Sequence, residues 1–242
     1  MSGWDIILYG ALPYAAVAAF FMGHYWRYRR DQYGWTSRST QLLESRALRL
    51  GSVAFHYGVF AAIGGHVLGI LIPASWTDAV GIDEDAYHVI SVIGGLTAGG
   101  AVLFGMLVLI WRRARYPRVR VTTTRNDVVV FALLAIGILT GLAVTVNNVV
   151  DAVNYRETAS PWFRSLFALD PDIDAMSGAN WVLQVHVMSV WLLYAMWPLS
   201  RLVHAWSIPV DWFRRSPVLF RGRSGRPRPA PAAAMRTARG RR

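Results

Sequence analysis

The sequence predicts an all-α integral membrane protein with a bundle of five transmembrane helices. Hydrophobic residues make up 54% of the 242 residues and the mean hydropathy is +0.32, a balance typical of multi-pass membrane proteins. The apolar residues gather in five stretches, each long enough to cross a bilayer as one helix. All 25 basic residues are arginines, and they gather beside these stretches. The five predicted spans are residues 4–26, 50–72, 88–111, 128–147 and 181–208.

Arginine is distributed unevenly between the loops that join the spans. Residues 27–49 and 112–125 hold six arginines each, whereas residues 73–87 hold none and carry four acids. In total, 23 of the 25 arginines lie in the first and third loops or towards the C-terminus. This bias predicts an external N-terminus and a cytoplasmic C-terminus in a protein of the cell membrane, in contact with lipid. The net charge of +11 then reflects topology rather than a nucleic-acid partner.

Several elements carry signals of their own. The third span holds five glycines, which let membrane helices approach closely. Asn126 or Asp127 is the expected N-cap of the fourth span. Residues 161–169 are expected to form a short helix in the membrane interface. We expect a membrane domain over residues 1–213 and a basic, Pro/Ala-rich, disordered cytoplasmic tail over 214–242.

Four histidines interrupt the second and fifth spans. Ionisable residues at membrane depth are costly, so each one suggests a function. The two spans run in opposite directions, which pairs His56 with His204 near the cytoplasmic side and His66 with His186 near the outer side. A b-type haem needs two axial nitrogens on opposite faces of its ring, and neutral imidazoles can supply them. The pairing therefore predicts an inner and an outer haem, each with its iron bound by two histidines.

The spacing of these histidines tests the idea. On regular helices His186 and His204 are five full turns and about 27 Å apart, whereas His56 and His66 are about 15 Å apart. Helix tilt could absorb the difference, which would put the irons on the order of 20 Å apart. The chain has no cysteine, which excludes covalent c-type haem and iron–sulfur clusters bound by this chain.

Five sequence runs carry a resemblance over residues 12 to about 213. The chain resembles the gamma, or cytochrome b, subunit of membrane-bound respiratory nitrate reductase. The runs are LPYAAVAAFFMGHYWRY, FHYGVFAAIGGHVLG, PRVRVTTT, LQVHV and SRLVHAWSIPVDW. The resemblance implies five spans and two b-type haems, with His56, His66, His186 and His204 at the positions of the axial ligands.

The same resemblance implies the activity and the partners. Quinol, either menaquinol or ubiquinol, would be oxidised near the outer haem with protons released outside. Electrons would pass to the inner haem and then to an Fe–S beta subunit, which lies with a molybdenum-containing alpha subunit on the cytoplasmic face. The chain would not reduce nitrate itself.

The quinol site is the least defined part of this prediction. Gly65 leaves space beside His66, and both are candidates for quinol contact. The family often has a lysine just before the third span, but this chain has no lysine at all. His88 or Asp85 could accept the proton in its place, and His88 could equally have no role.

The arginines at the end of the third span have two readings. Arg112 and Arg113 lie near the depth of the inner haem, where an arginine could pair with a haem propionate. They could instead be membrane anchors that also contact the partner subunits. His24 ends the first span without a partner at its own depth and is expected to be an interfacial residue.

Two other functions remain open at this point. One is a di-haem b subunit of another quinone-linked complex, of the heterodisulfide- or sulfite-reductase type. The other is a haem-free transporter that uses the histidines as a proton relay. Transporters usually show repeated halves, and this sequence shows no internal repeat.

Overall fold

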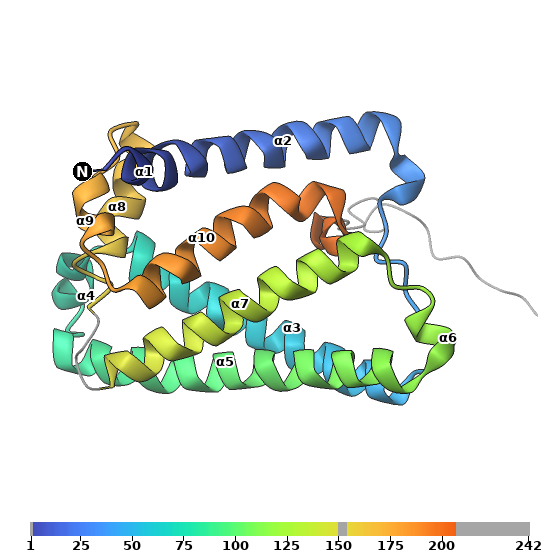
Figure 1. The fold of residues 1–242 in the computed structure, drawn as a ribbon. Helices are drawn as coiled ribbons and strands as arrows, with labels where there is room; N and C mark the ends of the chain where they lie inside the picture. The colour runs from blue at the N-terminus through green and yellow to red at the C-terminus, as the bar shows by residue number, and fades with distance from the viewer. Residues whose placement is uncertain (1, 150–153, 207–242) are drawn as a thin grey trace, which may run out of the picture. The chain divides into compact units, whose positions relative to one another are not determined.

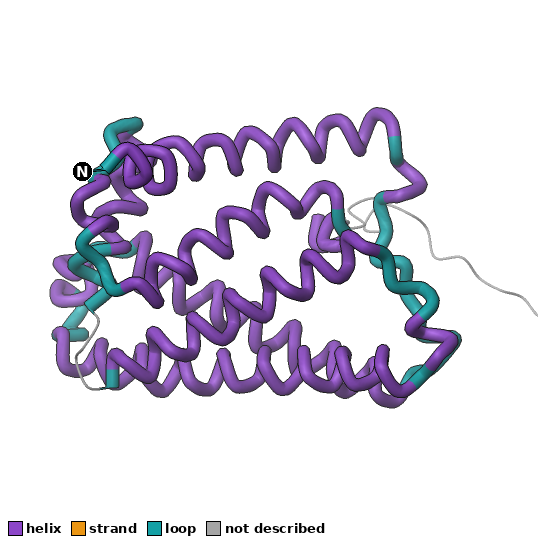
Figure 2. The backbone as a smooth tube through the Cα atoms, in the orientation of Figure 1, coloured by secondary structure: helices purple, strands orange, loops and turns teal. Residues whose placement is uncertain are grey.

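A computed structural model describes residues 2–149 and 154–206 of the chain. The chain divides into two units, Met1–Ser207 and Ile208–Arg242, and the predicted tail over 214–242 lies outside the described residues. All regular secondary structure in the described residues is helical (Figure 2). Everything below concerns the first unit.

Five helices in the described part are long and apolar enough to cross a membrane, which confirms the predicted fold class. Only 11–28% of the most apolar window of each helix is buried inside the chain, so most of this apolar surface faces outward. A surface of this kind suits lipid. The five are α1–η1–α2 (Gly3–Asp5, Ile6–Ala11, Leu12–Arg30), α3–η3 (Arg46–His66, Val67–Leu71), α5 (Glu84–Arg115), α7 (Arg125–Asn148) and α10–η5 (Trp181–Met196, Trp197–Leu199).

The helices pack in a continuous series. α3 lies along α5, α5 packs on α7, α7 on α10, and α10 on α2 (Figure 1). Glycines close the α3–α5 contact, because a Cβ at Gly105 would lie 2.7 Å from the carbonyl oxygen of Gly51. A Cβ at Gly58 would lie equally close to the backbone nitrogen of Val102. Part of the glycine content of the third span is therefore explained by close helix packing.

Charge separates the two ends of the bundle. At one end lie the loops over residues 31–45 and 116–124, beside the arginines of helix ends α2, α3 and α5; we call this the Arg-rich end. At the other end lie α4 (Ala74–Ala79), α8 (Ala159–Ser165), α9 (Ile173–Ser177) and the acidic first turn of α5; we call this the acidic end (Figure 1).

The helix predicted over 161–169 exists, but it begins earlier, and its first turn is mostly buried. α8 covers Ala159–Ser165 and continues as the 3-10 turn η4 (Leu166–Ala168). Trp162 is 1% exposed, and its indole N–H donates to the carbonyl oxygen of Tyr9 at 2.9 Å. The element therefore packs into the core at the acidic end through Trp162, whereas Phe167 and Leu169 are exposed, and its place in the membrane interface stays a prediction.

The start of α7 differs slightly from the prediction. The N-cap is Thr124, not Asn126 or Asp127. The Thr124 hydroxyl accepts from the Asp127 backbone N–H, and the Asp127 carboxylate accepts from the Thr124 backbone N–H, which forms a capping box.

The fifth predicted span is not one regular helix, and here the prediction was wrong. α10 ends at Met196, η5 follows, Ser200 is extended, and η6 (Arg201–Trp206) is a separate 3-10 helix. Pro198 lacks an N–H and cannot continue the helix. The buried Arg27 guanidinium then donates to the carbonyl oxygens of Pro198 and Ser200, at 2.6 and 3.0 Å, and stabilises the break.

Candidate functional site

The four histidines of the second and fifth spans meet in two pairs. The ring centres of His66 on α3 and His186 on α10 are 5.9 Å apart, with the ring planes inclined by 23°. The ring centres of His56 on α3 and His204 on η6 are 6.0 Å apart, with an inclination of 70°. These are the two pairs expected from residue depth, and their opposite order along the chain makes the two segments antiparallel.

Each of the four rings makes the same kind of hydrogen bond. A backbone carbonyl oxygen lies 2.5–2.9 Å from every Nδ1. A carbonyl can only accept, so each Nδ1 carries the proton and each Nε2 keeps a free lone pair. Metal-bound histidines show this arrangement, because the second hydrogen bond fixes the tautomer and the ring orientation. The acceptors are Ser52 for His56, Ala62 for His66, Gly137 for His186 and Arg201 for His204.

The separation of the rings can be compared with the needs of a metal. A metal–imidazole bond is about 2 Å long and the ring nitrogen lies about 1.1 Å from the ring centre, so two opposed imidazoles on one metal have centres about 6.3 Å apart. The observed 5.9 and 6.0 Å are close to this value. Haem iron needs only two protein ligands, because the porphyrin supplies the other four. Among the described residues, no cluster of three or more His, Cys, Asp or Glu side chains could hold a bare metal ion.

The distance between the two pairs follows from α3. His56 and His66 are ten residues apart on this helix, which corresponds to about 15 Å along its axis. The larger value of about 27 Å for His186 and His204 assumed a regular helix and does not apply across the break at Pro198. The iron separation of about 20 Å stays a prediction, and α3 alone gives about 15 Å along its axis between its two histidines.

The His186 ring is positioned by α7, a contact that was not predicted from the sequence. Its Nδ1 donates to the carbonyl oxygen of Gly137 on α7, and the Thr140 hydroxyl lies 3.4 Å from the same nitrogen. A Cβ at Gly141 would lie 2.9 Å from the ring carbon Cε1. Two glycines four residues apart, with a threonine between them, were the available signal in an otherwise apolar span.

The predicted quinol residues lie at the acidic end. A Cβ at Gly65 would meet no heavy atom within 4 Å, and the His66 side chain is exposed, so this side of the outer pair is open. Asp85 and His88 lie in the first two turns of α5, at the same end of the bundle as the C-terminus of α3 (Figure 1). Asp85 is exposed and His88 is half-buried.

Arg112 has a different environment from the one expected. Its buried guanidinium donates to the Glu44 carboxylate at 2.6 Å and to the Thr40 hydroxyl at 2.9 Å, and it also donates to the backbone carbonyls of both residues. All three nitrogens of the Arg112 guanidinium therefore donate to the loop between α2 and α3, and these contacts do not support a role as propionate partner. Arg113 donates to the Thr123 hydroxyl at 2.8 Å and lies over the ring of Phe131, and it stays a candidate.

The Arg112 contact also affects Glu44. Burial alone would raise the pKa of this carboxyl group. Hydrogen bonds from the backbone N–H groups of Ala47 and Leu48 and from Arg112 outweigh burial and hold the pKa below its ordinary value. The ionised carboxylate therefore stabilises the start of α3, from which His56 follows three turns later.

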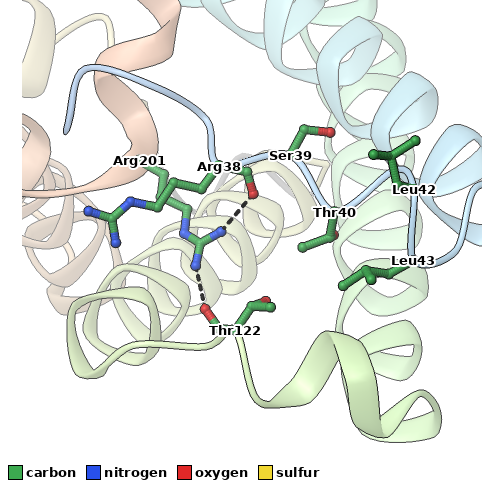
Figure 3. Close-up of a pocket in the computed structure, with 7 residues that line it drawn as sticks. All are labelled: Arg38, Ser39, Thr40, Leu42, Leu43, Thr122 and Arg201. Carbon is green, nitrogen blue, oxygen red and sulfur yellow. Dashed lines mark hydrogen bonds between the residues drawn. The ribbon is translucent and has the colours of Figure 1, made fainter. Parts of the chain in front are cut away.

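A second arginine, Arg201, fixes the segment that carries His204. Its Nε and Nη2 atoms each lie 2.7 Å from a carboxylate oxygen of Asp127. It also donates to the carbonyl oxygens of Thr122 and Arg38 across a cleft of about 390 Å³ (Figure 3). η6 is thereby attached to the N-terminus of α7 and to both loops of the Arg-rich end. The cleft is lined by Arg38, Ser39, Thr40, Leu42, Leu43, Thr122 and Arg201.

His24 shares one feature with the paired histidines. Its Nδ1 donates to the carbonyl oxygen of Phe20 at 2.7 Å, and its Nε2 is buried without a hydrogen-bond partner in the described part of the chain. Its ring packs against Phe20, Trp35 and Trp206 rather than against another imidazole.

Comparison with known proteins adds an independent result. The family model described as the nitrate reductase gamma subunit matches residues 5–223. The chain is 38% identical over 219 residues to the nitrate reductase gamma chain of Bacillus subtilis, which covers 90% of this chain and 98% of that protein. It is 29% identical over 222 residues to the respiratory nitrate reductase 1 gamma chain of Escherichia coli, with coverage of 90% and 98%.

A longer relative also matches. The nitrate reductase-like protein NarX of Mycobacterium tuberculosis strain H37Rv is 44% identical over 220 residues, covering 90% of this chain. The match covers 34% of that protein, so the chain spans about a third of its length. With the family model matching most of the chain, the chain belongs to the nitrate reductase gamma subunit family.

Proposed function

We propose that this chain is the di-haem b subunit that anchors a nitrate reductase in the cell membrane and oxidises quinol for it. The observation that carries the proposal is that four histidines of two antiparallel segments meet as two neighbouring imidazole pairs, with ring centres 5.9 and 6.0 Å apart. Each ring holds its proton on Nδ1 and offers Nε2, as a haem ligand must. His66 and His186 would hold the outer haem, and His56 and His204 the inner haem.

The bound haems would supply two one-electron carriers that join the outer quinol site to a partner on the cytoplasmic side. The chain's own residues would bind and orient the quinol and remove its protons. The open side at Gly65 admits a flat ring next to His66. Asp85 and His88, at the acidic end, are the proposed proton acceptors for the two protons that leave to the outside.

The proposed orientation follows from charge. Arginine gathers at the ends of α2 and α5 and at the start of α3, so the Arg-rich end would face the cytoplasm. Relatives named as gamma chains imply complexes with other nitrate reductase subunits. We propose an Fe–S beta subunit and a molybdenum-containing alpha subunit as the partners at this face.

The test is a haem count on the full chain purified in mild detergent. A pyridine haemochrome assay should give two haems per wild-type chain, and a reduced-minus-oxidised spectrum should show a b-type band. His56→Ala and His66→Ala should each remove one haem. His24→Ala is the matched control, because His24 has the same Nδ1 hydrogen bond but lies against aromatic rings instead of an imidazole, and it should keep both haems.

Two results would overturn the proposal. One is a wild-type chain without a b-type band, which would favour a haem-free membrane protein. The other is a purified complex with haem but no molybdenum, which would point to a different quinone-linked reductase.

A further inference from the structure

The acidic end contains only two arginines among its described residues, Arg156 and Arg164, and the proposed function uses neither of them. Both come from the segment before α10. Arg164 donates to the carbonyl oxygen of Ile70, four residues after His66, and Arg156 donates to side chains at the start of α5 and on α4. Both described cations of the acidic end therefore lie on the segment that precedes α10 and beside the residues that follow His66.

The segment after His66 is the π-helix η3 (Val67–Leu71). π-helical turns are rare and are frequent at functional sites. Here the carbonyl oxygen of Gly69 accepts from the buried Ser160 hydroxyl at 2.8 Å. The carbonyl oxygen of Ile70 accepts from Nη1 of Arg164 at 3.0 Å. α8 therefore holds two successive carbonyls of η3.

Gly69 also lets two tyrosines approach the same turn. A Cβ at Gly69 would lie 2.5 Å from the Tyr87 hydroxyl and 3.0 Å from the ring of Tyr155. The two hydroxyls are hydrogen-bonded to each other at 2.8 Å. η3 is thus enclosed by α8 on one side and by this tyrosine pair on another.

Arg156 holds the tyrosine pair in place. Its guanidinium lies 3.8 Å from the centre of the Tyr87 ring, a distance at which cation–π attraction is strong. It donates to the Glu84 carboxylate at 2.7 Å and to the Thr77 hydroxyl at 3.0 Å. Arg156 is 9% exposed, and its contacts with Tyr87 and Thr77, which are both buried, are shielded from solvent, whereas the Glu84 side chain is 57% exposed.

We propose that Arg156 and Arg164 are positioning residues for quinol oxidation, which clamp η3 and thereby fix the orientation of the His66 imidazole. The inference rests on the proposed function, since it assigns His66 to the outer haem. It adds that His66 is held in place not by α3 alone but also by α8, Tyr87 and Tyr155, which pack around the residues that follow it. Loss of the clamp should affect the outer site and leave the inner one unchanged, because His56 lies about 15 Å away along α3.

The test compares Arg156→Gln and Arg164→Gln with Arg156→Lys, Arg164→Lys and the control Arg120→Gln in the full chain. Arg120 is an exposed arginine at the Arg-rich end, so the control removes the same charge far from η3. The first readout, hydrogen–deuterium exchange, does not need haem. Amides 67–72 should exchange at least about tenfold faster in both Gln variants, since Arg164→Gln removes the cation that donates to the Ile70 carbonyl oxygen and Arg156→Gln removes the cation that lies against Tyr87.

The second readout is a redox titration of both haems in membranes. The Gln variants should shift the midpoint potential of the outer haem and lower the kcat of quinol oxidation, with the inner haem unchanged and the Lys variants in between. Unchanged exchange over 67–72 would overturn the proposal, as would equal shifts of both haems or an unshifted outer haem. A wild-type chain without haem would defeat the proposed function alone, and the exchange readout would still show whether the clamp exists.

Discussion

Gly141→Ala should weaken the outer pair selectively, because α7 leaves no room for a methyl group next to His186. The added Cβ would lie 2.9 Å from Cε1 and 3.2 Å from Nδ1 of that ring. Ordinary carbon contacts need about 3.5–4.0 Å, so the imidazole must move by about 0.5–1 Å. Insertion of an extra methyl group into a packed site typically costs about 1–3 kcal/mol. If this cost falls on haem binding at the outer pair, the affinity for that haem falls about five- to 150-fold. The movement would also strain the hydrogen bond from Nδ1 to Gly137.

The assay is the haem-to-chain ratio together with the optical spectrum. The ratio should fall from two towards one, with the remaining spectrum matching that of His66→Ala. Gly100→Ala on α5 is the matched control, because a Cβ at Gly100 would meet no heavy atom within 4 Å. A Gly141→Ala chain that keeps both haems at wild-type affinity would refute the reasoning, as would a selective loss of the inner haem.

Three further predictions concern the supports of the fold. Arg27→Ala should leave the carbonyl oxygens of Pro198 and Ser200 without their donor, which should lower the free energy of unfolding by about 1–3 kcal/mol for each carbonyl. Haem analysis should then show loss of the inner haem first, and a uniform loss of both haems would contradict this. Gly105→Ala should lower the thermal unfolding temperature in detergent more than Gly100→Ala does, because its methyl group would collide with the backbone of α3; equal effects would exclude a tight α3–α5 contact. The lowered pKa of Glu44 means that its ionised form adds stability above the ordinary carboxyl pKa and that this stability is lost as pH falls through the lowered value. Unfolding measured from pH 6 to pH 3 should therefore show a steeper acid loss in the wild type than in Glu44→Gln, and identical slopes would argue against the Glu44–Arg112 ion pair.

The parts of the structure that follow from local sequence patterns were predictable. Apolar length predicts the number of spans, and the placement of arginine distinguishes the two ends of the bundle. Antiparallel direction and residue depth were enough to pair His66 with His186 and His56 with His204. These inferences need only the position of a residue along its own span.

The parts that depend on contacts between distant segments were not predictable in this way. Arg112 reaches Glu44, 68 residues away, and Ser160 reaches Gly69, 91 residues away. No local pattern marks such partners. The break of the fifth span is different, since Pro198 signalled it in the sequence. Hydrophobicity on both sides of Pro198 concealed that signal and led to an overlong helix.

The pairing of the histidines is tested most directly by electron paramagnetic resonance of the oxidised full chain in four single variants. The wild type should show two low-spin ferric haem signals. His186→Ala should remove the same signal as His66→Ala, and His204→Ala the same signal as His56→Ala. If His66→Ala and His204→Ala removed one common signal, or if all four variants kept both signals, the assignment of one haem to each histidine pair would be contradicted.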